Sequence, residues 1–150
     1  MNLFRPNVLV EVEGRLTELT SDSTAQWGKM SPHQAVCHLA DTFRMVLGDR
    51  SIAMKTGLLT RTAIRFFVLT LPLPWPKNVA TAPELDQARD GTTPAEFQAD
   101  VDELKALMAK FVAPAGQGME THPIFGNLTA GEWGRWGYRH LDHHLRQFGV

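Results

Sequence analysis

The amino-acid sequence predicts an all-α protein, a four-helix bundle with one long crossover between the second and third helices. Three segments combine a helix-capping signal with apolar residues at helical spacing, and a fourth segment shows the spacing. No segment shows the sustained alternation of apolar and polar residues that is typical of β-strands. The connection from Gly48 to Thr92 is far longer than ordinary bundle loops, which predicts a crossover with structure of its own.

The first two helices are expected at residues 6–20 and 31–47. One face of the first carries the apolar residues Leu9, Val12, Leu16 and Leu19. In the second, Ser31 serves as N-cap, Pro32 takes the first helical position, and Gln34 can reach back to the cap N–H. Gly48 follows as a C-terminal stop.

The last two helices of the bundle are expected at residues 93–112 and 129–148. The run Thr93-Pro94-Ala95-Glu96 repeats the capping chemistry of the second helix. The run Thr129-Ala130-Gly131-Glu132 repeats it again, without the proline, and Gly149 provides a stop.

The crossover itself contains two predicted segments. Residues 58–70 have the composition of a short helix, with Arg61 and Arg65 on one side. Residues 71–76 contain three prolines, so they are incompatible with a helix and are expected to lie extended across the core.

Composition limits the function classes. A chain of 150 residues, 43% apolar and 21% charged, is expected to form a single domain over 1–150. A formal charge of −1 lacks the basic surplus that nucleic-acid binding requires. The single cysteine, Cys37, excludes an intrachain disulfide and fits a reducing cytoplasm. The most apolar run, 66–75, is about half a bilayer span, so no membrane partner is expected.

Two histidines of the last helix share one face. At about 100° per residue, His140 and His144 lie opposite the charged side of that helix. Their i, i+4 spacing is the separation that one metal ion can bridge. The alternative is a pair of core or boundary histidines satisfied by hydrogen bonds, or an exposed cluster. His143 lies at the margin of this face and is expected to point away from the site.

A third imidazole would complete a facial metal site. His38 lies on a helix face with few charges, and with His140 and His144 it would leave an open coordination position, as in catalytic sites. By itself, His38 would be read as a histidine bonded to a nearby carbonyl. Asp41, one turn on, is either a carboxylate that supports the ligands or acts as a base, or a solvated charge paired with Arg44 or a lysine.

These residues lie in four motifs: Trp27-Gly28-Lys29-Met30-Ser31, His38-Leu39-Ala40-Asp41, His122-Pro123-Ile124-Phe125-Gly126 and the run His140 to Gly149. The motifs resemble those of the DinB-like superfamily and, within it, a subgroup that has no settled activity. The resemblance spans nearly the whole chain. It implies a four-helix bundle with the long crossover and a divalent metal on His38, His140 and His144.

What the resemblance implies about activity is broader. Known relatives include thiol transferases that use low-molecular-weight thiols, a mycothiol-dependent maleylpyruvate isomerase and some hydrolases. We therefore expect a metal-dependent transferase of thiols to small electrophiles. A metal-dependent hydrolase and a non-catalytic metal-binding or stress-response bundle are the alternatives. Zinc or nickel is the expected metal, with iron or manganese behind. The expected partner is a small-molecule substrate; a low-molecular-weight thiol cosubstrate and a homodimer are left open.

His122 and Cys37 are two further residues whose side chains could take part in chemistry. His122 either lies at the mouth of the site, binding substrate or completing the coordination, or belongs to a loop-packing motif in which Gly126-Asn127 forms a turn. The loop-packing interpretation is preferred. Cys37 projects about 100° away from His38, so it is not expected to be a ligand or a nucleophile.

Overall fold

The computed structural model describes residues 1–54, 57–113, 119 and 121–150. Within these residues the regular elements are helices, and one isolated antiparallel bridge pairs His122 with Gly126. This confirms the predicted all-α class. None of the described helices is long and apolar enough to cross a membrane.

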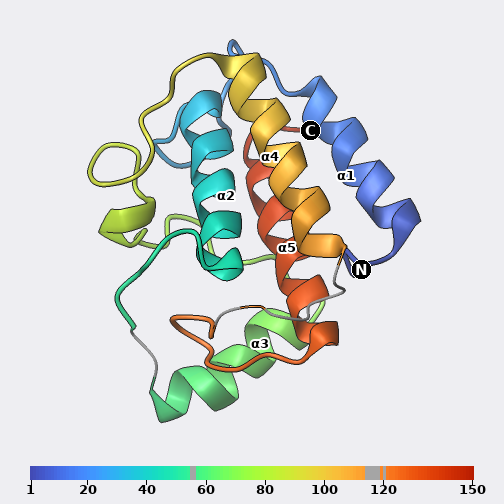
Figure 1. The fold of residues 1–150 in the computed structure, drawn as a ribbon, viewed down its shortest axis with the longest axis vertical. Helices are drawn as coiled ribbons and strands as arrows, with labels where there is room; N and C mark the ends of the chain where they lie inside the picture. The colour runs from blue at the N-terminus through green and yellow to red at the C-terminus, as the bar shows by residue number, and fades with distance from the viewer. Residues whose placement is uncertain (55–56, 114–118, 120) are drawn as a thin grey trace.

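Four helices form the bundle. They are α1 (Pro6–Glu18), α2 (Pro32–Leu47), α4 (Phe97–Val112) and α5 (Ala130–Gln147). The colour gradient of Figure 1 shows that α2 and α4 lie side by side and run in the same direction, whereas α1 and α5 run the opposite way. Because two neighbouring helices are parallel, the chain between them must return along the whole bundle. The chain between α2 and α4 makes this return, and it is the predicted long crossover.

The starts of α2 and α5 are the predicted capping boxes. The Gln34 N–H donates to Ser31 Oγ at 3.1 Å, and the Ser31 N–H donates to Gln34 Oε1 at 2.9 Å. At α5, Thr129 and Glu132 make the same reciprocal pair. Gly48 ends α2 in the left-handed conformation, with φ of 86°.

The start of α4 differs from the prediction. The helix begins at Phe97 instead of near residue 93, and its N-cap is Glu96, whose carboxylate accepts from the N–H groups of Gln98 and Ala99 at 3.1 and 2.7 Å. The preceding chain is tied elsewhere: the Thr92 N–H donates to the Asp41 carboxylate at 2.8 Å. Nearer the helix, the Ala95 N–H donates to the Asp100 carboxylate at 3.1 Å, so residues just before Phe97 are bonded to side chains of α4 instead of continuing the helix.

The crossover contains the predicted short helix. Residues 58–70 are helical, first as a turn of π-helix over Thr60–Ile64 and then as α3 (Arg65–Thr70). In Figure 1, α3 lies across the end of the bundle where α5 begins. The Arg65 guanidinium there donates to both carboxylate oxygens of Glu132, at 2.8 and 2.6 Å.

The proline-rich segment 71–76 is non-helical, as predicted, and lies along α5. The Arg139 guanidinium donates to the carbonyl oxygens of Leu71 and Leu73. Trp75 is partly buried against the core, and its indole N–H donates to the Val68 carbonyl at 2.9 Å.

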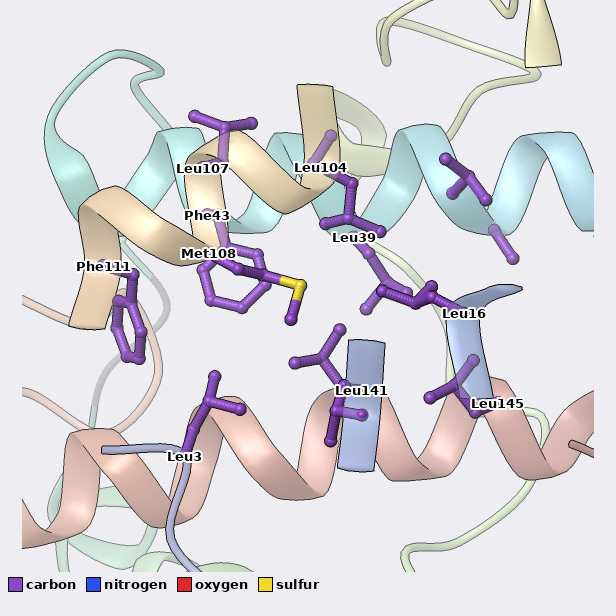
Figure 2. Close-up of a cluster of buried hydrophobic side chains, with 14 of the residues drawn as sticks. Leu3, Leu16, Leu39, Phe43, Leu104, Leu107, Met108, Phe111, Leu141 and Leu145 are labelled. Carbon is purple, nitrogen blue, oxygen red and sulfur yellow. The ribbon is translucent and has the colours of Figure 1, made fainter. Parts of the chain in front are cut away.

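Figure 2 shows the apolar core between the helices. Side chains from α1, α2, α4 and α5 meet there; they include Leu16, Leu39, Phe43, Leu104, Met108, Phe111, Leu141 and Leu145, all at most 1% exposed. This packing fixes α2 against α5, so the polar side chains that the two helices direct at each other are held in register.

The Arg65–Glu132 pair supports a prediction about stability. Hydrogen bonds from Arg65 and Thr129 lower the pKa of Glu132 from 4.5 to about 2. We expect Glu132→Gln to lower the free energy of unfolding by about 1–2 kcal/mol at neutral pH. Because the folded-state pKa is depressed, the difference between wild type and variant is full above pH 4.5 and disappears as the pH falls toward 2.

Urea denaturation between pH 7 and pH 3 measures this difference. Glu18→Gln, which changes an exposed carboxylate at the end of α1, is the control and should leave stability nearly unchanged. A Glu132→Gln penalty that is the same at every pH would contradict the ion pair.

Candidate metal centre

Three imidazoles from two helices converge at one point. His38 comes from α2, and His140 and His144 come from α5; a ring nitrogen of each lies within 4.8 Å of a ring nitrogen of the other two. The Nε2 atoms of His38 and His140 are 3.2 Å apart. Two nitrogens on bonds of ~2.0–2.1 Å at a tetrahedral angle lie about 3.3 Å apart, so this spacing matches that of two ligands on one zinc ion.

His38 is oriented by the crossover. Its side chain is buried, and its Nδ1 lies 2.9 Å from the carbonyl oxygen of Leu85, in the short 3₁₀ turn Pro83–Leu85. A carbonyl only accepts hydrogen bonds, so Nδ1 carries the proton and Nε2 keeps its lone pair. That lone pair faces the other two histidines.

His144 is oriented in the same way by Gln147. The amide nitrogen of Gln147 donates to the Trp27 carbonyl at 2.9 Å, which fixes which end of the amide is oxygen. The amide oxygen then accepts from His144 Nδ1, also at 2.9 Å. The Nε2 lone pair of His144 is therefore left free, as it is on His38.

Gly28 makes room for this arrangement. It has a φ of +82°, and a Cβ atom at this position would lie 2.7 Å from the Gln147 amide nitrogen. Both the backbone conformation and the close approach require glycine. The motif that begins at Trp27 thus contributes to the site through its main chain.

Burial keeps the three imidazoles neutral. It lowers the pKa of His38, His140 and His144, and the pKa of His140 and His144 is lowered further because neighbouring imidazoles oppose an added positive charge. Neutral imidazole is the form that ligates metals. The donor set fits a divalent ion of the kind that histidine binds.

His143 lies outside the cluster of three. Its ring packs against Trp27 and Trp75, with centroids 5.9 and 6.1 Å away, and meets the ring of His144 edge-on at 5.1 Å. The side chain is thus adjacent to the site, on the side of the proline-rich segment.

Asp41 is completely buried and is not a solvated charge. Its carboxylate accepts five hydrogen bonds, from Arg44, Arg50, Gln87 and both the N–H and hydroxyl of Thr92, at 2.6–3.0 Å. The expected pairing of Asp41 with Arg44 is one of these five bonds. A carboxylate with this many donors ties the crossover to α2, and this environment favours a structural role over that of a base.

His122 has the surroundings of a packed loop residue. Its ring is buried and stacks on Phe125 at 4.6 Å, and its Nδ1 accepts from the N–H groups of Ile124 and Phe125 at 3.1 and 3.2 Å. Burial lowers its pKa to about 3. Gly126, with φ of +73°, closes the turn by a two-way backbone bridge to His122. These contacts favour the loop-packing interpretation.

Cys37 belongs to a separate hydrogen-bonded group. The Asp100 carboxylate on α4 lies 2.6 Å from His33 Nε2 and accepts from the Cys37 thiol at 3.5 Å. Burial and the nearby carboxylate raise the pKa of Cys37 to about 12. A thiol held protonated in this way is a poor nucleophile.

Sequence reasoning missed the two groups that orient the ligands. Gln147 stands three residues after His144, a helical spacing that would have brought the two side chains together. The Leu85 carbonyl carries no such signal, because a main-chain acceptor in a crossover leaves no trace in residue type.

The fold and the site together define a class: a helical bundle with a parallel central pair and a candidate three-histidine metal centre between α2 and α5. The chain belongs to the DinB superfamily, whose family model matches residues 7–148. No curated protein and no solved structure matches the chain significantly.

The environment of Asp41 predicts the effect of its removal. Asp41→Asn should lower the free energy of unfolding by about 2–4 kcal/mol, because the amide nitrogen replaces an oxygen of a completely buried carboxylate that accepts five hydrogen bonds, and Arg50 loses its carboxylate partner within the described residues. Chemical denaturation measures the change, with Asp49→Asn at an exposed position as the control. Unchanged stability would contradict the structural role.

Proposed function

We propose that His38, His140 and His144 hold a divalent metal ion and that the protein is a metal-dependent enzyme, a transferase of thiols to small electrophiles. The observation that carries the metal is the orientation of the rings. His38 and His144 each have Nδ1 donating to a fixed acceptor, and the Nε2 atoms of His38 and His140 face each other at 3.2 Å. The transferase activity rests on membership of the DinB superfamily.

Three protein ligands would leave one position for water, thiol or substrate. A divalent metal bound there supplies a Lewis acid that lowers the pKa of a water or thiol toward neutrality. Zinc or nickel suits three imidazoles, and iron or manganese is less favoured. The proposed setting is a reducing cytoplasm, where the buried thiol of Cys37 would stay free.

The roles of the surrounding residues follow from their contacts. Gln147 and the Leu85 carbonyl keep the Nδ1 protons in place and so keep the ligating lone pairs aimed at one point. The indole of Trp75 packs beside the ring of His140, with the ring centroids 5.6 Å apart. We assign neither Asp41 nor His122 to the chemistry.

The first test is metal analysis of protein purified without a histidine tag. Wild type should carry a single ion per chain after incubation with zinc or nickel and dialysis. His140→Ala should lose it while keeping its helicity, because α5 has its own cap and apolar face. His143→Ala, the matched control on the same helix, should keep the metal. Loss of metal in both variants, or in neither, would overturn the ligand assignment.

Activity is tested separately. Metal-loaded protein is assayed against small electrophiles with and without small thiols, and against simple esters and amides. Turnover that needs a thiol supports the transferase, and turnover of esters or amides alone identifies a hydrolase instead. Tight metal binding with no turnover in any assay would identify a non-catalytic metal-binding bundle.

Gln147 allows a finer prediction. Gln147→Met keeps the length of the side chain but removes the acceptor for His144, so metal affinity should fall by about 10–100-fold. Gln147→Glu keeps an acceptor and should lose less. Competition with a chromophoric chelator measures both affinities. Equal affinities in the two variants would show that the hydrogen bond does not support the ligand.

A further inference from the structure

A cavity of about 610 Å³ opens beside the histidine cluster. It lies between the proline-rich segment 71–76 and one side of α5. Two of its lining side chains, Trp75 and His143, also contact the cluster: the Trp75 ring lies 5.6 Å from that of His140, and the His143 ring 5.1 Å from that of His144. The cavity and the candidate metal centre therefore share a wall.

The charged groups around the cavity are mostly basic. The basic side chains are Lys77, Arg135, Arg139 and Arg146, and Asp142 is the acidic one. Asp142 is already paired with Arg15 at 2.9 Å and with Arg146 at 3.8 Å. The oxygen of Val150, which also lines the cavity, accepts from Arg15 at 3.0 Å.

Three of the basic groups lack a carboxylate partner among the residues that the structure describes. Arg139 donates to two neutral carbonyl oxygens, and Lys77 stands 4.1 Å over the ring of Trp27. The buried Nε of Arg135 has no hydrogen-bond partner in the described part of the chain. Basic side chains without a carboxylate partner favour an anionic ligand.

The rest of the wall is aromatic and apolar. Trp27 and Trp75 face the space together with Tyr138 and Pro72. The volume lies within the range of about 300–1,000 Å³ that is usual for small-molecule sites. Aromatic walls with a few cationic groups suit a molecule with a flat apolar body and one anionic end.

We propose that this cavity is a binding site for a small organic anion, of the aromatic carboxylate class, with the apolar body against Trp27 and Trp75 and the anionic group paired with the basic side chains of the wall, of which Lys77 stands over the Trp27 ring. As a substrate site it rests on the proposed function, because it places such a molecule beside the three histidines. Binding itself does not require the metal.

The experiment compares benzoate with benzamide, which has the same shape and no charge. Binding to metal-free wild-type protein is followed by the indole N–H resonances of Trp27 and Trp75. We expect benzoate to bind at least about tenfold more tightly than benzamide, as a charge-assisted hydrogen bond predicts. Equal binding of the two, or no binding of benzoate, overturns the proposal.

Variants then locate the anion. Lys77→Gln, or Arg135→Gln if the anion lies nearer the start of α5, should weaken benzoate binding by about tenfold and leave benzamide unaffected. Arg89→Gln, at an exposed position outside the cavity, is the matched control and should bind as wild type does. Unchanged benzoate affinity in both cavity variants overturns the proposal. If Arg135→Gln fails to fold, Lys77→Gln and the comparison of benzoate with benzamide on wild-type protein still test the proposal.

Metal content of the same variants separates this proposal from the function proposed above. Arg135→Gln should keep a wild-type metal content, because Arg135 is not among the three histidines or their hydrogen-bond partners. A protein that binds benzoate but no metal would leave the anion site standing and refute the metalloenzyme. A protein that binds metal but not benzoate would leave the metal site standing and refute the anion site.

Discussion

Two buried polar side chains on α2, His38 and Asp41, need hydrogen-bond partners, and the crossover supplies them. The Leu85 carbonyl accepts from His38, and Gln87 and Thr92 donate to Asp41. A buried imidazole or carboxylate without such partners would cost several kcal/mol. The returning segment 85–92 is therefore held against α2 by groups that cannot be left unpaired.

This constraint follows from the topology. Because α2 and α4 are parallel, the chain must travel back along the bundle before α4 begins (Figure 1). The returning chain passes α2 where His38 and Asp41 are buried, and Thr92, which donates to Asp41, lies shortly before α4. The orientation of one candidate ligand thus depends on the path that the topology imposes on the crossover.

The helix starts and the histidine face could be predicted wherever they depend on neighbouring residues, and the predictions failed where distant residues take part. The caps at Ser31 and Thr129 use neighbouring residues, so the starts of α2 and α5 were predicted correctly. The face that carries His140 and His144 followed from helical periodicity. Thr93 is predicted as another cap, but Glu96 caps α4 and the Ala95 N–H donates to the Asp100 carboxylate. The burial of Asp41 could not be predicted locally, because its partners Gln87 and Thr92 are distant in sequence.

Gln147 links the candidate metal centre by hydrogen bonds to residues 26 and 27, a part of the chain that contains no candidate ligand. Its side chain bonds the Trp27 carbonyl, and its main-chain oxygen accepts from the Gln26 N–H at 2.8 Å. The ring of His144 and the segment that joins α1 to α2 therefore both bond to the same residue, Gln147. Loss of the bond to Trp27 would leave the amide that orients His144 without its own anchor. A substitution in the segment that joins α1 to α2 can therefore alter the candidate centre without touching any of its three histidines.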